Sequence, residues 1–263
     1  MKHIKPYKIF ENKSPNFPTT REEVIEVCKR YDIRYYTIND DLSIDISGGV
    51  FLDRKKLEYL PVRFNYVSGS FNCSDNKLKS LEGCPQTISG SFNCSDNYLE
   101  SLKGCPQTVD EVFNCSKNVI KSLKGCPQEV RAFHCFGNRL ESLEGGPQTV
   151  NEDYDCSNNT LNTLKGCSQT VGGYFNIYNN KLTDLEYFPE VNGPIYTTKN
   201  LVHHLVYTFI DNADIFMIED FVDYEIVRNG NTVMLDRLET FIRDNDLEMP
   251  DLEEIKKHYK IIE

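Results

Sequence analysis

The stretch that decides the fold runs from Val67 to Thr108 and reads VSGSFNCSDNKLKSLEGCPQT and then ISGSFNCSDNYLESLKGCPQT. The same arrangement of apolar residues, Cys, Asn and Leu recurs along the chain every 21 or 20 residues. We delimit the units as 46–66, 67–87, 88–108, 109–129, 130–149, 150–170, 171–190 and a partial unit at 191–205. A unit this short cannot bury its own apolar face, so the phased copies predict a solenoid in which each unit packs on its neighbours.

Each unit is expected to contain one short strand. Phe71 and Cys73 alternate with polar residues, which is the pattern of a half-buried strand. Stacking the units places these strands in parallel, about 4.8 Å apart. Leu78 and Leu81 are expected to point inward and fill the core. A coil of this length leaves little room for a back-side helix, so we expect extended or 3₁₀ segments on the return.

From unit 67–87 onward, one column of the repeat is asparagine. Because a buried amide without partners costs about 1–3 kcal/mol, we expect each of these side chains to point inward and bond to the backbone of the turn. The column consists of Asn76, Asn97, Asn118, Asn138, Asn159, Asn180 and Asn200.

The cysteines follow the repeat and do not follow the spacing of a metal site. Nine of the ten fall into two columns, and Ile177 and Phe188 take the place of Cys in the last full unit. Replacement by apolar residues indicates a buried filler position, and no C-x-x-C occurs, so we expect free thiols, no metal and no cofactor. Many unpaired thiols favour a reducing cytoplasm. The two columns are Cys73, Cys94, Cys115, Cys135 and Cys156, and Cys84, Cys105, Cys126 and Cys167.

The spacing apolar-x-C-x-x-N-x-L-x-x-L resembles the leucine-rich repeat in its shortest form, over about residues 46–205. The recurring F-N-C-S-x-N and G-C-P-x-T segments, and the lead-in YTINDDLSIDISGGVFL from Tyr36 to Leu52, also resemble uncharacterised leucine-rich-repeat proteins of large tailed bacteriophages. The resemblance implies a leucine-rich-repeat solenoid encoded by a phage.

Residues 1–45 are predicted to form a tail followed by a cap for the first coil. A capping box at Thr20 begins a helix that ends at about Arg30. Two short strands, Tyr35–Asn39 and Leu42–Ile46, then read as a hairpin that leads into the first unit.

Residues 206–263 are predicted to form a small, acidic α/β cap domain. Residues 201–263 hold 15 acidic and six basic side chains, so most of the net charge of −11 lies there. The expected elements are helices over Leu201–Ile210, Ile215–Phe221 and Met234–Arg243, a hairpin of Tyr224–Arg228 with Thr232–Met234, and a last helix that begins near Pro250.

Composition excludes several classes of protein. The 263 residues are 39% hydrophobic, and no stretch approaches the roughly 20 apolar residues of a membrane helix. No signal-peptide core follows the first lysines, which argues against ordinary secretion. The acidic balance argues against direct binding to nucleic acid.

The outward positions of the strands identify a candidate binding surface on the concave sheet. Early units carry bland residues there, such as Ser70, Asn72 and Ser74, whereas later units carry aromatic and charged residues. Exposed aromatics beside acids are typical of protein-binding hot spots, although aromatic pairs across strands can also simply stabilise a sheet. The candidate residues are His134, Phe136, Asp153, Asp155, Tyr174, Tyr178 and Tyr196.

We therefore predict a non-enzymatic protein-binding module, and the phage resemblance implies a host cytoplasmic protein as its partner. A structural or packaged virion protein is an alternative. An enzyme with an unrecognised site in the C-terminal domain is another, supported by the acid cluster Glu219, Asp220, Asp223 and Glu225, but no nucleophile–base or phosphate-loop motif accompanies it. The acidic tail could also mimic nucleic acid towards a basic protein.

Overall fold

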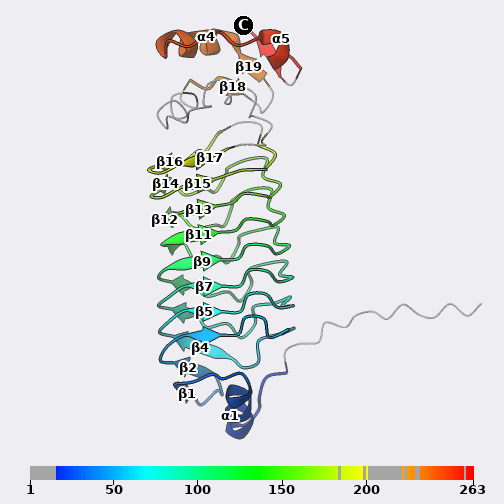
Figure 1. Cartoon of the computed structure of the whole chain (residues 1–263), viewed down its shortest axis with the longest axis vertical. Coiled ribbons are helices and arrows are strands. Elements are labelled where there is room, and N and C mark those ends of the chain that lie inside the picture. The colour runs from blue at the N-terminus through cyan, green and yellow to red at the C-terminus, as the bar shows by residue number, and fades with distance from the viewer. Residues whose placement is uncertain are drawn as a thin grey trace, which may run out of the picture.

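The computed structural model describes residues 16–182, 185–197, 200, 221, 224–228, 232–257 and 259–263. The repeats form a parallel β-solenoid whose coils stack along the long axis of the molecule (Figure 1). The predicted solenoid with short parallel strands is confirmed, and the described residues between Tyr31 and Tyr196 contain no helix.

One strand of every coil joins an eight-stranded parallel sheet, as the alternation of Phe and Cys with polar residues predicts. Neighbouring strands pair in register with the repeat, for example Phe71 with Phe92 and Phe92 with Phe113. The strands are β3 (Val50–Phe51), β5 (Phe71–Asn72), β7 (Phe92–Asn93), β9 (Val112–Asn114), β11 (Ala132–His134), β13 (Tyr154–Asp155), β15 (Phe175–Asn176) and β17 (Ile195–Tyr196).

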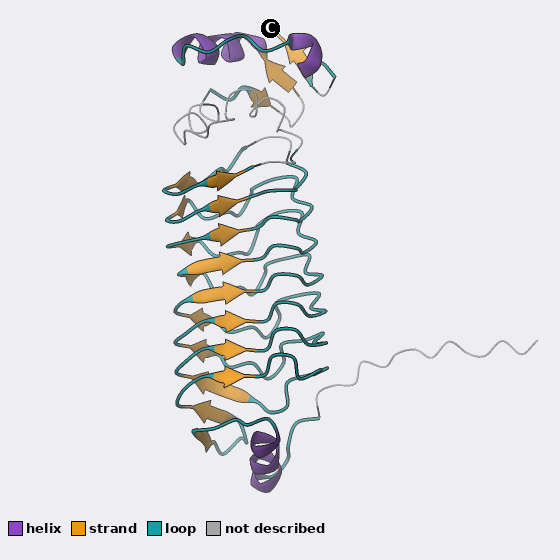
Figure 2. Ribbon diagram, viewed as in Figure 1, coloured by secondary structure: helices purple, strands orange, loops and turns teal. Residues whose placement is uncertain are grey.

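A second row of parallel strands, in segments predicted only to be extended or 3₁₀, lies just before the first row in each coil (Figure 2). Two-residue strands are too short for alternation to reveal them. One group is β2 (Ile44–Ile46), β4 (Phe64–Val67), β6 (Thr87–Ile88) and β8 (Thr108–Val109), and the other is β10 (Glu129–Val130), β12 (Thr149–Val150), β14 (Thr170–Val171) and β16 (Glu190–Val191).

The second row is interrupted between β8 and β10 because one coil is short at its corner. Val130 and Phe133 are three positions apart, whereas Val109 and Phe113 are four apart. The Arg131 N–H therefore donates to the Glu111 carbonyl at 2.9 Å, two residues further along than the acceptor in the preceding coil, where the Asp110 N–H donates to the Ile88 carbonyl.

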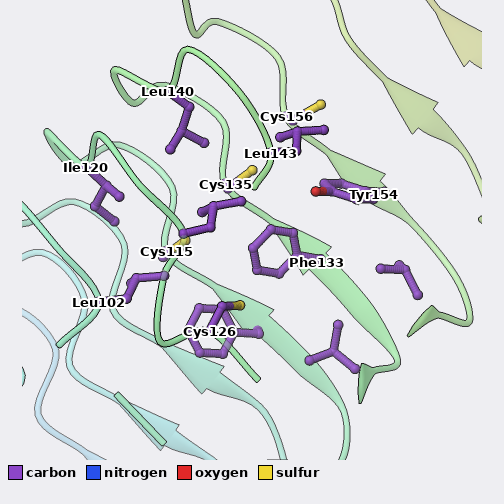
Figure 3. Packing of buried hydrophobic residues seen from close by; sticks show 14 of the residues in the cluster. Leu102, Cys115, Ile120, Cys126, Phe133, Cys135, Leu140, Leu143, Tyr154 and Cys156 are labelled. Carbon is purple, nitrogen blue, oxygen red and sulfur yellow. The ribbon is translucent and has the colours of Figure 1, made fainter. Parts of the chain in front are cut away.

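The core consists of columns of similar apolar side chains, one from each coil. Rings in the first inward column, from Phe71 to Phe175, lie with their centroids 5.2–6.0 Å from those of the next coil. The two predicted Leu columns are buried beside them, as Leu102, Leu140 and Leu143 show in Figure 3. Burial of each large apolar side chain contributes about 1.5–3 kcal/mol.

A compensating pair of substitutions sits in this core. Tyr154 replaces Phe in the aromatic column, and Gly146 replaces Cys in the neighbouring column of the coil below. A Cβ at Gly146 would lie 3.0 Å from the Leu123 Cδ1 and 3.6 Å from the Tyr154 Oη, so the space beside the added hydroxyl is already filled without a side chain at position 146. The smaller residue makes room for the larger one.

The asparagine column forms a buried ladder, as predicted. The Nδ2 of Asn97 donates to the carbonyl of Cys94 in its own coil at 3.1 Å and to that of Cys73 in the preceding coil at 3.0 Å. Its Oδ1 accepts the N–H of Leu78 at 2.9 Å. Each amide therefore satisfies backbone groups of two coils and ties them together.

The cysteines are free thiols, and nine of the ten are buried. They fill space beside the Phe and Leu columns, where Figure 3 shows Cys115, Cys126, Cys135 and Cys156. Burial raises the pKa of Cys28 to about 11 and that of Cys73 to about 12. The interpretation of these residues as apolar filler is confirmed.

The N-terminal end carries the expected helix and hairpin. Helix α1 (Arg21–Arg30) begins after Thr20, whose hydroxyl accepts the N–H of Glu23. Its buried residues Val24 and Cys28 face the core. Strand β1 (Tyr36–Ile38) pairs antiparallel with β2, which then joins the second row of the solenoid.

The C-terminal region contains the expected hairpin and helices and one unexpected strand. The elements are β18 (Val227–Arg228), β19 (Thr232–Met234), α4 (Leu235–Asp244), α5 (Leu252–Ile255) and β20 (Lys260–Ile262). Strand β20 extends the hairpin by pairing in parallel with β19. The helices predicted over residues 201–210 and 215–221 lie outside the described residues, apart from Phe221. None of the described helices has the length and apolar character needed to cross a membrane.

Replacement of Asn118 by Ala should destabilise the whole array. The change leaves the Leu99 N–H and the Cys94 and Cys115 carbonyls without this partner, and buried unpaired groups cost about 1–3 kcal/mol each. We expect a loss of about 3 kcal/mol in the free energy of unfolding, measured by urea denaturation. Lys103→Ala is the control, because Lys103 is exposed on the return and should change stability by less than about 0.5 kcal/mol. Equal losses for the two variants would contradict the ladder.

The thiols should be nearly inert in the folded protein. Thiolates are the reactive form, and burial raises the pKa even of the half-buried Cys167 to about 12. We expect slow labelling by an aromatic disulfide reagent at pH 8 in the native state and labelling of all ten thiols after unfolding. Rapid labelling of the native protein would show that the columns are open.

Candidate functional site

The seven predicted residues lie on one side of the eight-stranded sheet. Along β11 and the residue positions after it, Phe133 and Cys135 are buried, whereas His134 and Phe136 are partly exposed. The same alternation holds in the next two coils. We call this set the patch, which consists of His134, Phe136, Asp153, Asp155, Tyr174, Tyr178 and Tyr196.

Strand register brings the central residues of the patch together. His134 pairs with Asp155, Asp155 with Asn176, and Asn176 with Tyr196. These four residues therefore form a row in which neighbours are about 4.8 Å apart. Asp155 lies in the middle of the patch, beside His134.

Asp153 and Tyr174 form a second row of the patch, two residues before Asp155 and Asn176 in their coils. The Tyr174 N–H donates to the Asp153 Oδ1 at 3.1 Å, so these residues are neighbours in adjacent coils. The rings of Tyr174 and Tyr196 meet edge to face with their centroids 6.1 Å apart. Aromatic side chains therefore border the two carboxylates.

Phe136 and Tyr178 occupy a third row, two residues after His134 and Asn176. Backbone bonds hold both positions: the Phe136 carbonyl accepts the Lys117 N–H and the Tyr178 carbonyl accepts the Asn158 N–H, each at 2.8 Å. The coil between them carries a serine in this row. The two rings are thus separated by two coil spacings, about 10 Å.

The two carboxylates are held in place by hydrogen bonds but lack a cation. The Asp155 Oδ1 accepts the Ser157 N–H at 2.9 Å and its Oδ2 accepts the Asn176 amide at 3.2 Å. No lysine or arginine of the described chain forms an ion pair with Asp153 or Asp155. By contrast, Glu152 at the corner pairs with Arg131 at 2.9 Å.

His134 does not supply the missing positive charge at neutral pH. Burial lowers the pKa of His134 from its usual value of 6.5, and the nearby Asp155 and Asp153 oppose that shift only in part. The imidazole is therefore mainly neutral at pH 7. Burial also raises the pKa of Tyr174 to about 12, so its hydroxyl keeps its proton.

A glycine that sequence analysis overlooked shapes the patch. A Cβ at Gly173 would lie 2.2 Å from the Asp153 Oδ1, so only glycine allows that carboxylate to lie over the next coil. The signal was present in the sequence, because Val171 is followed by Gly-Gly where earlier units have Ser-Gly or charged residues.

The acid cluster proposed for an enzymatic site is only partly described. Glu219, Asp220 and Asp223 lie outside the described residues, and Glu225 forms an ion pair with Arg237 at 2.5 Å. Among the residues that the structure describes, no group of three or more His, Cys, Asp or Glu side chains has a geometry that could hold a metal ion.

The titration of His134 tests the electrostatics of the patch. Because burial lowers its pKa and Asp155 raises it, Asp155→Asn should lower the pKa of His134 further. Imidazole chemical shifts followed by NMR across pH 4–8 would measure both values. A midpoint above 6.5, or an upward shift in the variant, would contradict this assignment.

Comparison with protein family models, with curated proteins and with solved structures finds no match to this chain.

Proposed function

We propose that the protein is a non-enzymatic binding module that uses the patch to contact another protein. The observation that carries the proposal is the change of character along one sheet face. Units 67–87 and 88–108 carry only Ser and Asn in the three rows, whereas the four coils between residues 130 and 205 that hold the patch carry aromatic rings around two carboxylates. Aromatic residues are enriched at protein-binding hot spots.

Sheet stability alone does not account for these residues. The early coils form the same strand pairing and the same asparagine ladder with Ser and Asn at the matching positions. The fold therefore does not require rings at positions 136, 174 and 178. Partly exposed rings that the fold does not need favour a role in recognition.

The repeat motif supports a finer proposal about origin. The spacing of Cys, Asn and Leu resembles the short leucine-rich repeat, and the lead-in to the first coil resembles proteins of large tailed phages. We propose that the chain acts in the cytoplasm of an infected host on a host protein. Its ten unpaired thiols are consistent with a reducing compartment.

Reversion of the patch to the standard residues of the repeat tests the proposal. Phe136→Ser and Tyr178→Ser introduce the residue that Ser74 and Ser95 already provide in the same row, so the coil should fold normally. Loss of hot-spot rings should weaken capture of the partner from a lysate of the native host by about tenfold or more.

Two controls accompany this experiment. Tyr98→Ser removes an exposed ring from the return side of the solenoid and should leave capture unchanged. Thermal unfolding should show that each variant remains folded. Unchanged capture by the folded double variant Phe136→Ser/Tyr178→Ser would overturn the proposed binding face.

A further inference from the structure

Resting on the proposed function, we propose that the patch recognises an arginine side chain presented by its protein partner. The guanidinium group would lie against Asp153 and Asp155, between the rings that border them. The argument depends on charge, on the geometry of the two carboxylates and on the position of the rings.

The two carboxylates lie on the same side of one strand, and Asp153 offers an oxygen that accepts no hydrogen bond from the described residues. Asp153 and Asp155 are two residues apart, so their Cα atoms are about 7 Å apart. Asp153 uses its Oδ1 to hold the Tyr174 N–H, and no described residue donates to its Oδ2. A guanidinium group carries five N–H donors in a planar fork and can bond to carboxylates in pairs.

No cation of the described chain is available to neutralise this pair. Arg131 is engaged by Glu152 at 2.9 Å, and Lys117 pairs with Asp96 at 3.6 Å in a different row. His134, the one basic side chain in the patch, is mainly neutral at pH 7. The patch therefore carries two negative charges, which complement a cationic partner and repel an acidic one.

The rings provide the rest of a site for a planar cation. Tyr174 lies next to Asp153, and its ring contacts that of Tyr196 edge to face with the centroids 6.1 Å apart. Phe136 lies on the opposite side of the row that contains Asp155. Guanidinium groups stack on aromatic faces, and such contacts gain strength when partly shielded from water. Acidic and aromatic residues together favour arginine over a purely apolar partner.

The repeat supplies variants that remove the charges without disturbing the sheet. Asp155→Asn installs the residue found at Asn72 and Asn93, and Asp153→Ser installs the residue found at Ser70 and Ser91. An asparagine at 155 keeps an Oδ1 that can accept the Ser157 N–H, as Asn93 does for Ser95. Glu100→Gln with Glu141→Gln is the matched control, because it removes two exposed negative charges from the return side.

The probe is an extended Gly/Ala peptide with one central arginine, compared with the same peptide carrying citrulline, which has a similar shape but no charge. NMR titration of the full chain at low ionic strength should show saturable amide shifts in units 130–149, 150–170 and 171–190. Loss of the charge-assisted contacts should weaken binding by about tenfold or more for the citrulline peptide and for Asp153→Ser/Asp155→Asn.

Equal binding of the two peptides, equal binding by the charge variant, or no saturable shifts at millimolar peptide would overturn arginine recognition. The host-lysate experiment separates this failure from that of the proposed function. If Phe136→Ser/Tyr178→Ser abolishes capture and Asp153→Ser/Asp155→Asn does not, the face binds protein but not through arginine. If both variants retain capture, the proposed function itself is wrong.

Discussion

The buried asparagine ladder is the interaction on which the solenoid depends. Every amide bonds to backbone groups of its own coil and of the coil before it, as Asn97 does with Cys94, Cys73 and Leu78. A coil that misplaced this residue would leave several buried groups unpaired, at a cost of about 1–3 kcal/mol each. The ladder stays intact across both 20-residue steps, from Asn118 to Asn138 and from Asn180 to Asn200, since the Oδ1 atoms of Asn138 and Asn200 still accept the N–H groups of Ile120 and Leu182. Length therefore varies only away from the ladder, at the corner before Phe133 and at the turn before Glu190.

This constraint divides the residues of each coil into two groups with different freedom. Inward columns of Phe, Cys, Asn and Leu must repeat, because each side chain packs on its counterparts in the neighbouring coils. Even the deviation at Tyr154 is matched by Gly146 below it. Outward positions have no such requirement, so the sheet face can change from Ser and Asn to aromatic and acidic residues with no change in backbone pairing. A solenoid of this kind provides a rigid surface on which recognition residues vary.

The sequence predicted the parts of the structure that periodicity controls. The strand row, the inward asparagines, the filler thiols, helix α1 and the hairpin β18–β19 follow from spacing and local signals. The second strand row was missed because a pair such as Thr87–Ile88 is too short to show a period, and β20 was missed because its residues pair with residues of β19 that lie 28 positions earlier. The rows of the patch could also be predicted, because adding the repeat period of 20 or 21 to a residue number gives its neighbour in the next coil. The mainly neutral state of His134 depends on its burial, and the lack of an ion pair at Asp155 among the described residues depends on side chains in other coils. Neither can be predicted from the spacing of the repeats.

The carboxylates of Asp153 and Asp155 form no ion pair within the described chain, and the fold does not require acidic residues at these positions. Half-buried like charges cost free energy, and the same positions in earlier coils hold Asn and Ser without loss of structure. The chain also shows that it can neutralise an acid in this region, because Glu152 next to Asp153 has Arg131 as its partner. Sequences keep such conflicts chiefly where function requires them. A partner that supplies the missing positive charge would remove the conflict on binding, so the instability of the free patch becomes part of its affinity and of its selectivity for a cation.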